Sequence, residues 1–112
     1  MKMIIAVIKP FKLAEVREAL NDMGVHGMTV TDVRGYGRQK GNSEMYVGAE
    51  AATSFVNKVK FDIAVEDNQV DAVVDTILKS AGSGKVGDGK IFVYNIEQVV
   101  RISTHERGAA AI

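Results

Sequence analysis

The order of hydrophobic patterns along the chain is the feature that most restricts its fold. An apolar run rich in β-branched residues is followed by a helical period and a second strand-forming run, and the same succession returns in the second half. Two such units in tandem predict an α+β, ferredoxin-like (βαββαβ) fold, in which a four-stranded antiparallel sheet carries both helices on one face. The expected strands and helices lie at residues 3–8, 12–23, 28–35, 59–65, 70–81 and 91–94.

The ends of these elements carry stop and start signals. Gly24 follows the first helical period and is expected to end it in a left-handed conformation, and Gly82 is expected to end the second helix. Asp67 or Asn68 is the expected cap at the start of the second helix. Residues 99–102 can form a further short strand, whereas the Gly–Ala tail that closes the chain is expected to be loose.

The first strand is apolar on both faces, from Met3 to Ile8. Helices cover only one face of the predicted sheet, so the other face must meet water or a neighbouring subunit. The two-sided apolar pattern favours a subunit. The chain reads as a single domain over residues 1–112, and a chain this short buries only about two-thirds of its unfolded surface on its own, which also favours an oligomer.

The charge composition argues against a general attraction to nucleic acid or anionic membranes, because 14 basic residues balance 14 acidic ones. The chain has no cysteine, which excludes disulfides and thiolate metal sites and agrees with a reducing compartment. The apolar start is cut short by Lys9 and Pro10 and lacks a cleavage signal, so we expect a strand there and not a signal peptide. No apolar run approaches the length of a membrane span. These observations predict a cytoplasmic protein.

Residues 35–54 have no sustained hydrophobic period of either kind. They contain four glycines and several polar residues, as a loop would. Loops of this length are uncommon in compact domains and are usually functional or mobile. We therefore expect a functional loop between the second and third strands.

A second glycine-rich segment, residues 83–90, joins the second helix to the last strand and contains three glycines and two lysines. Glycines allow successive backbone N–H groups to point into one concavity that binds phosphate oxygens, and lysine adds positive charge. The segment is not the loop of P-loop enzymes, because the glycine–lysine spacing differs and a strand follows instead of a helix. It is either an anion site or an ordinary solvated turn.

Three cationic side chains outside or at the edge of this turn are candidates for the same site. Arg101 lies beyond the strand that the turn leads into, and Arg38 lies with Lys40 at the start of the long loop. Guanidinium groups bind phosphate through paired hydrogen bonds, so Arg38, Lys90 and Arg101 would form a triphosphate pocket if the fold brought them together. Taken singly, each is a solvated surface charge.

The sequence contains no evident catalytic centre. His26 and His105 have no acidic or cysteine ligand at metal-binding spacing, so we assign neither a role. Ser43, Ser54 and Ser83 lack the neighbouring base that activates a nucleophile. We therefore expect a protein that acts without catalysis.

Three segments of the chain resemble one known family. They are Lys9–Pro10–Phe11–Lys12–Leu13, Gly35–Tyr36–Gly37–Arg38–Gln39–Lys40–Gly41 and Gly87–Asp88–Gly89–Lys90–Ile91–Phe92–Val93. In sequence and in order they are similar to the PII nitrogen-signalling proteins, and the likeness extends over essentially the whole chain. The resemblance implies a homotrimer that binds ATP or ADP between subunits and regulates other proteins by contact.

The resemblance also implies the parts of the site. The T-loop, which contacts targets, would span about 37–55, the B-loop about 82–90 and the C-terminal segment about 101–112. The implied nucleotide-binding residues are Gly35, Gly37, Arg38, Gly87, Asp88, Gly89, Lys90 and Arg101. The implied 2-oxoglutarate-binding residues are Gln39, Gly41, Lys58 and Gly87, with Gln39 also a ligand of the Mg²⁺ that accompanies ATP. The implied targets are an ammonium transporter, a nitrogen-assimilation enzyme or a transcription regulator.

Several residues depart from the family pattern. Ala51 and Ala49 stand where uridylylated and phosphorylated members carry tyrosine and serine, so we expect no covalent modification, and Tyr46 is not the modified position. Val47 replaces an arginine that plugs the pore in members that block ammonium channels, which argues against that target. Ser103 replaces a phosphate-contacting arginine, and losing one charge-assisted bond costs about 1.5–3 kcal/mol, so nucleotide binding should be weaker or altered but not abolished.

Two other functions fit parts of the pattern. A ferredoxin-like sheet can bind RNA, but that needs exposed aromatic side chains on the central strands and a basic face, whereas these strands are dominated by Val and Ile and the net charge is zero. An ATP-using enzyme would need a base, for which Asp88 is the candidate. A carboxylate between glycines more often shapes a turn.

Overall fold

The computed structural model describes residues 1–36 and 55–112 and confirms the predicted order of elements. The elements are β1 (Lys2–Ile8), α1 (Leu13–Asp22), β2 (Thr29–Gly35), β3 (Val56–Val65), α4 (Val70–Ala81) and β4 (Gly89–Asn95), with short 3₁₀ helices η1 (Pro10–Lys12), η2 (Asp67–Gln69) and η3 (Gly108–Ala111). Pro10 begins η1 because it fixes its own φ and has no N–H to add to the β1 ladder. The predicted helical period from Lys12 is therefore a 3₁₀ turn followed by α1.

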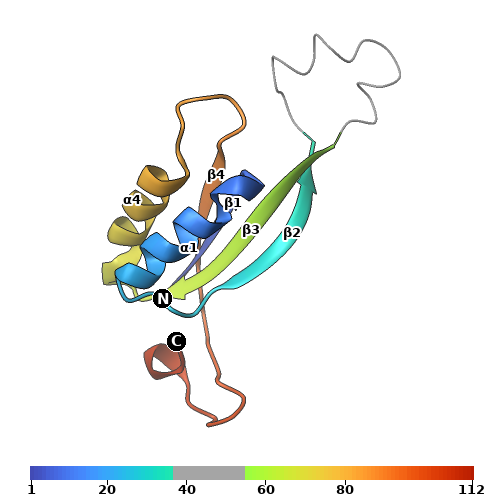
Figure 1. Cartoon of the computed structure of the whole chain (residues 1–112). Coiled ribbons are helices and arrows are strands. Elements are labelled where there is room, and N and C mark those ends of the chain that lie inside the picture. The colour runs from blue at the N-terminus through green and yellow to red at the C-terminus, as the bar shows by residue number, and fades with distance from the viewer. Residues whose placement is uncertain (37–54) are drawn as a thin grey trace.

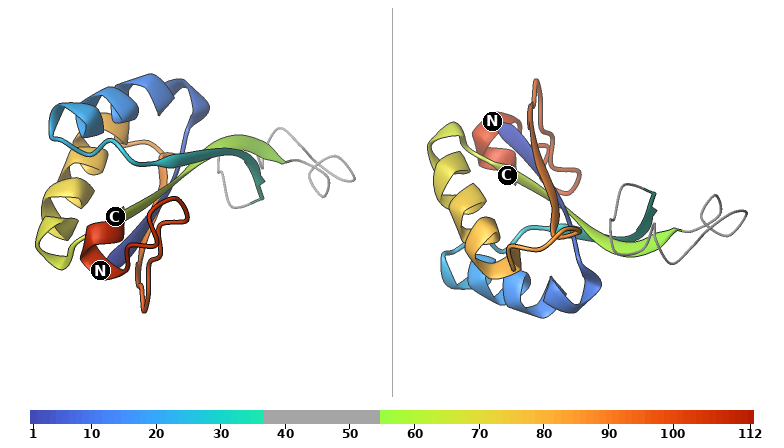
Figure 2. Two further views of the ribbon diagram at one scale, coloured as in Figure 1. Left: turned by 90° about the horizontal axis from the view of Figure 1, so that it is seen from below. Right: turned by 90° about the horizontal axis from the view of Figure 1, so that it is seen from above.

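The four strands form one antiparallel sheet in the order β2-β3-β1-β4. β1 pairs with β3 and with β4 along its whole length, and β2 pairs only with β3. Helices α1 and α4 lie side by side on one face of this sheet, as Figures 1 and 2 show. The arrangement confirms the ferredoxin-like fold.

The core lies between the sheet and the two helices. Alternate residues of β1 and β3 point toward the helices and are buried, with Phe61 at the centre, while Val16 and Leu20 of α1 and Ile77 of α4 close the layer from the other side. The alternation follows from the pleat of a strand, which sends successive side chains to opposite faces. The remaining buried apolar residues of this core are Ile4, Ala6, Ile8, Val25, Val59, Ile63, Val65, Val73 and Ala81.

The other face of the sheet, which we call the open face, carries the alternate residues of the same strands. On β1 these are Met3, Ile5 and Val7, which are only partly buried. Phe92 and Tyr94 of β4 pair with two of them and are about half exposed. An apolar sheet face left partly exposed in one chain is a surface that a second chain can cover.

Two helix ends test the predicted caps. Gly24 has φ +92°, which confirms the left-handed stop after α1. The prediction of a cap at Asp67 or Asn68 is wrong, because both residues lie within η2, which precedes α4. Glu66 is the capping residue of η2, and its N–H donates to the Gln69 side chain at 3.4 Å. Asp67 is instead held by the N-terminal amine at 2.7 Å, because the start of β1 lies beside the end of β3.

The C-terminal segment differs from the prediction. Residues 99–102 do not form a strand; Val100 and Arg107 make a single antiparallel bridge that closes a turn. The Gly–Ala tail is not loose, because η3 begins at Gly108, which takes φ +71°, and buries Ala111. The small side chains of residues 108–111 show no hydrophobic period in the sequence, but they allow η3 to pack closely.

Two further features concern the long loop and the helices. The β2–β3 ribbon leads to residues 37–54, which lie outside the described residues, and Figure 1 shows it extending beyond the helices. Within residues 1–36 and 55–112, no helix is both long and apolar enough to cross a membrane.

Candidate functional site

The predicted anion turn connects α4 to β4, and its backbone requires glycine. Gly84, Gly87 and Gly89 have φ values of +76°, +95° and +113°, a region that other residues rarely adopt. At Gly89 there is a second reason, because a Cβ atom would lie 1.7 Å from the carbonyl oxygen of Val7. The glycines therefore let the chain turn sharply and approach β1 at the start of the β1–β4 ladder.

Asp88 organises this turn from within. One carboxylate oxygen accepts hydrogen bonds from the N–H groups of Ser83 and Gly84, at 2.8 and 2.9 Å, and the other accepts one from the Ser83 hydroxyl. Lys9, just after β1, forms an ion pair with the same carboxylate at 3.1 Å. The bonds from Ser83, helped by Lys9, hold the pKa of Asp88 well below its ordinary value.

Lys58 of β3 meets the turn from the other side. Its ammonium group donates a hydrogen bond to the carbonyl oxygen of Gly87. Partial burial, together with the positive charge of Lys9, lowers the pKa of Lys58, and the charge of Asp88 opposes that change. Two lysines and one carboxylate thus meet at the end of the sheet where the turn lies.

Gly35 lies at the same end of the sheet. It is the last residue of β2 and pairs with Val56, and a Cβ atom there would lie 3.6 Å from Cγ of Lys58. Lys90 belongs to β4, opposite Val7, and its side chain is exposed. The fold therefore brings together, at one end of the sheet, five of the predicted site residues besides Lys90: Gly35, Lys58, Gly87, Asp88 and Gly89.

Arg101 is not at this end. Its guanidinium group donates to the carbonyl oxygen of Ile112 at 3.2 Å and lies 3.6 Å from a carboxylate oxygen of Glu106. The length of β4, about 17 Å from Lys90 to Asn95 at 3.4 Å per residue, separates Arg101 from the turn within one chain. Figure 1 shows the turn and the C-terminal segment at opposite ends of β4. One chain alone does not assemble the predicted phosphate pocket.

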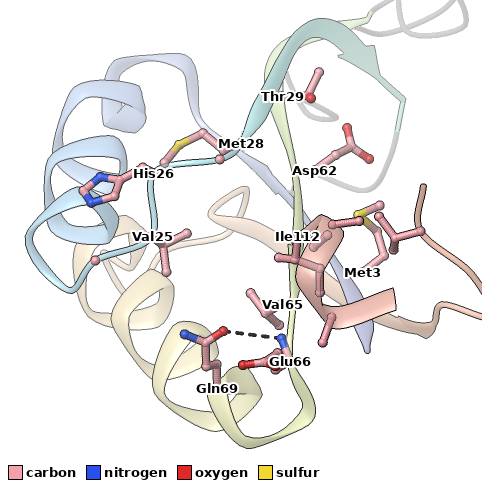
Figure 3. Close-up of a pocket in the computed structure, with 16 residues that line it drawn as sticks. Met3, Val25, His26, Met28, Thr29, Asp62, Val65, Glu66, Gln69 and Ile112 are labelled. Atoms are coloured by element: carbon pink, nitrogen blue, oxygen red, sulfur yellow. Dashed lines mark hydrogen bonds between the residues drawn. The ribbon is translucent and has the colours of Figure 1, made fainter. Parts of the chain in front are cut away.

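A hollow of about 770 Å³ lies beside the C-terminal segment (Figure 3). Its walls come from residues 24–29, from the start of β1, from the end of β3 with η2, and from the C-terminal segment. That segment includes Ile112, whose carbonyl oxygen accepts the hydrogen bond from Arg101. Met3, Val25 and Met28 give it apolar surface. Polar groups of Thr29 and Asp62 also line it. Sequence reasoning missed this hollow, because its residues come from five separate segments with no shared pattern.

Some predicted residues cannot be placed. Gly37, Arg38, Gln39 and Gly41, and with them Tyr46, Val47, Ala49 and Ala51, lie outside the described residues. Ser103 lies in the exposed turn closed by Val100 and Arg107. Across residues 1–36 and 55–112, no three His, Cys, Asp or Glu side chains cluster as a metal site would require.

The two histidines have local contacts. The Nδ1 atom of His26 lies 2.6 Å from the side-chain oxygen of Asn21, at the end of α1. His105 takes φ +63° and donates its N–H to the carbonyl of Arg101 at 2.8 Å, which tightens the C-terminal turn. Lys9 is the residue near the site that sequence reasoning passed over, because nothing in its spacing pairs it with Asp88, 79 positions later.

Comparison with known proteins identifies the family of the chain. The family model described as nitrogen regulatory protein P-II matches residues 1–106. The chain is 57% identical to nitrogen regulatory protein P-II of Pasteurella multocida and 53% identical to nitrogen regulatory protein GlnK of Escherichia coli K12, in both cases over all of both chains. The crystal structure of Arabidopsis thaliana PII bound to citrate has a TM-score of 0.83 and 38% identity, covering 99% of this chain and 91% of the other. The chain therefore belongs to the nitrogen regulatory protein P-II family.

Proposed function

We propose that this P-II protein is a non-enzymatic sensor of ATP or ADP and of 2-oxoglutarate, and that it regulates a partner protein through the loop at about 37–55. The observation that carries the proposal is the turn at 82–90, where three glycines at positive φ bend the backbone sharply beside Lys90 and next to Lys58. Such a turn suits the phosphate groups of a nucleotide.

The nucleotide is shared between subunits. The turn of one subunit holds phosphate oxygens, and Arg101 of a second subunit supplies the guanidinium that cannot reach them within one chain. The hollow beside Arg101, with apolar walls and polar groups at Thr29 and Asp62, suits the base of the same nucleotide. Mg²⁺ would be held by the phosphates and by Gln39, which lies outside the described residues.

The subunits assemble as a trimer through the open face. Apolar side chains gather there on β1 and β4, at Met3, Ile5, Val7, Phe92 and Tyr94. Covering this face removes apolar surface from water and brings the end of β4 in one chain toward the turn of another. Without such an assembly, the nucleotide site would remain divided between its two halves.

2-Oxoglutarate binds beside Lys58. This side chain lies between the end of β2 and the anion turn, where an ammonium group can pair with a carboxylate and Gly87 is within reach. The related Arabidopsis protein has been crystallised with citrate, which is also a polycarboxylate. Gln39 and Gly41 would complete the site from the loop.

The same geometry connects ligand binding to the loop. Gly35 and Val56 are the last ladder pair before residues 37–54, and Lys58 is two residues farther along β3. A ligand that binds Lys58 and the turn therefore changes the relative free energies of loop conformations, and a partner that binds only some of them is regulated. The partner is a nitrogen-assimilation enzyme or regulator, or an ammonium transporter, although Val47 argues against the transporter.

The test combines calorimetry with a mass measurement on the full chain. We expect binding of ATP and ADP, tighter binding of 2-oxoglutarate when Mg²⁺ and ATP are present, and a mass of three chains by light scattering. A monomer that binds neither nucleotide would contradict the proposal. A pull-down from cell extract, with ATP, with ADP and with ATP plus 2-oxoglutarate, would then identify the partner and its signal.

The RNA-binding alternative has less support. On the open face, the described aromatic side chains of β4 lie on an edge strand, and the central strand β1 carries Met3, Ile5 and Val7 instead. For the enzyme alternative, the only base proposed was Asp88, and its carboxylate is already occupied by Ser83, Gly84 and Lys9. The geometry therefore supports the sensor more strongly than either alternative.

A further inference from the structure

Asp88 holds the anion turn together at both of its ends. Its own backbone follows Gly87, while its side chain reaches back to the N–H groups of Ser83 and Gly84 and to the Ser83 hydroxyl. Its backbone N–H also donates to the carbonyl of Lys85, at 3.3 Å. The carboxylate therefore fixes where the start of the turn lies relative to Gly87 and Gly89.

Lys9 connects this carboxylate to the sheet. The Lys9 side chain is 20% exposed and its ammonium group lies 3.1 Å from Asp88. Lys58 holds the neighbouring Gly87 carbonyl from β3. The turn is thus attached to the residue following β1 and to β3 at two adjacent residues, Asp88 and Gly87, and Gly89 begins β4 directly after them.

A carboxylate beside phosphate-binding amides needs an explanation, because its charge repels a phosphate. Here Ser83 and Gly84 donate three hydrogen bonds to it and Lys9 compensates its charge. Both of its oxygens already have partners in Ser83, Gly84 and Lys9. The depressed pKa of Asp88 agrees with a carboxylate whose ionised form is strongly favoured by these donors.

We propose that Asp88 is the positioning residue of the phosphate-binding turn and that Lys9 keeps it in place, so that neither side chain needs to contact the nucleotide. The inference rests on the proposed function, since it assigns a role within the nucleotide site. It replaces the direct nucleotide contact that the family resemblance suggested for Asp88.

The test is calorimetry of ATP binding to the full chain and to three variants. Asp88→Asn keeps the shape of the side chain and loses its charge, and Lys9→Met removes the ion pair; we expect each to raise the Kd for ATP about tenfold, the loss of roughly one charge-assisted interaction. Lys9→Arg restores the ion pair and should bind nearly as wild type. Asp67→Asn is the matched control, because it removes a carboxylate held by an amine elsewhere in the fold.

Two readouts separate positioning from contact. The loss of ATP affinity in Asp88→Asn should be the same in the presence of Mg²⁺ and in the presence of a chelator. If Asp88 instead contacted the nucleotide through the metal, the variant and wild type would bind ATP equally in chelator, and that result would overturn the inference. In the ligand-free Asp88→Asn variant, the amide NMR signals of Ser83 and Gly84 should shift upfield and exchange faster with water, and unchanged signals would also overturn it.

The outcomes distinguish this inference from the proposed function. If wild type binds ATP and both Asp88→Asn and Lys9→Met bind it equally well, only the positioning role is wrong. If wild type binds neither ATP nor ADP, the proposed function is wrong and the positioning role is wrong with it. Circular dichroism and the mass of the assembly would show that each variant still folds.

Discussion

Replacing Gly89 by alanine is expected to damage the site through the backbone and without removing any ligand contact. A Cβ atom at this position would lie 1.7 Å from the Val7 carbonyl oxygen and 2.8 Å from its carbon. The obstacle is the backbone of β1, which cannot rotate away as a side chain could. The Gly89→Ala chain must therefore move the start of β4 away from β1, and the anion turn with it.

The magnitude follows from two contributions. A residue other than glycine at the φ of +113° costs about 1–3 kcal/mol. Moving the strand start also weakens one or two ladder hydrogen bonds, at about 1 kcal/mol each. We expect Gly89→Ala to lower the free energy of unfolding by about 2–5 kcal/mol and to abolish most ATP binding.

Gly24→Ala is the matched control. Gly24 has φ +92°, but apart from its own residue and its two chain neighbours no described atom lies within 4 Å of the point that a Cβ would occupy, so this variant carries the backbone strain without the collision. Gly24→Ala should lower the free energy of unfolding by about 1–2 kcal/mol. Urea unfolding measures both variants, at one protomer concentration because an oligomer's stability depends on it. Equal losses in the two variants would refute the argument from the Val7 carbonyl.

Further predictions concern the core, the second half of the site and two carboxylates. Phe61→Ala should cost about 3–5 kcal/mol in urea unfolding, because the ring is fully buried, and a loss below about 1 kcal/mol would contradict that packing. Arg101→Ala should raise the Kd for ATP about 10–100-fold in calorimetry without changing the thermal unfolding of the chain appreciably; unchanged affinity would remove Arg101 from the site. In an NMR titration, Asp67 and Asp88 should both titrate below the ordinary value of about 3.9, Asp67 because the N-terminal amine donates to it and Asp88 because Ser83 does. Each therefore stabilises the fold above the unfolded-state pKa and loses that contribution as the pH falls through its lowered pKa, and acetylating the N-terminus should return only Asp67 to its ordinary value.

Most of the fold could be read from local pattern. The period of two in β3 and the helical period in α4 each reflect one face turned toward a core, so the type and order of elements followed from the spacing of apolar side chains. Glycine was equally informative where backbone conformation decides, as at Gly24 and in the turn at 82–90. In these places, the cause of the structure lies within a few residues of chain.

The failures of sequence reasoning occurred where the cause lies elsewhere in the chain. Asp67 was expected to cap a helix, but the N-terminal amine lies beside it because the start of β1 pairs with the end of β3. The Gly–Ala tail has no hydrophobic period of its own, and it forms η3 because Ala111 is buried against the rest of the chain. Whether a residue caps a helix, or whether a tail packs, depends on which other groups lie near it in the fold. The spacing of residues in the sequence does not show which groups those are.

The amino-acid pattern predicts the class of the fold, the position of the turn and the residue types able to hold an anion. Which of these residues meet depends on the folded sheet, which pairs Lys9 with Asp88 and Lys58 with Gly87 and places Arg101 against the carbonyl of Ile112, at the end of β4 away from the turn. The reason is physical. Periodicity records which face of an element avoids water, whereas a binding site depends on the register and direction of strands that are distant in the chain, and these are set when the whole sheet packs.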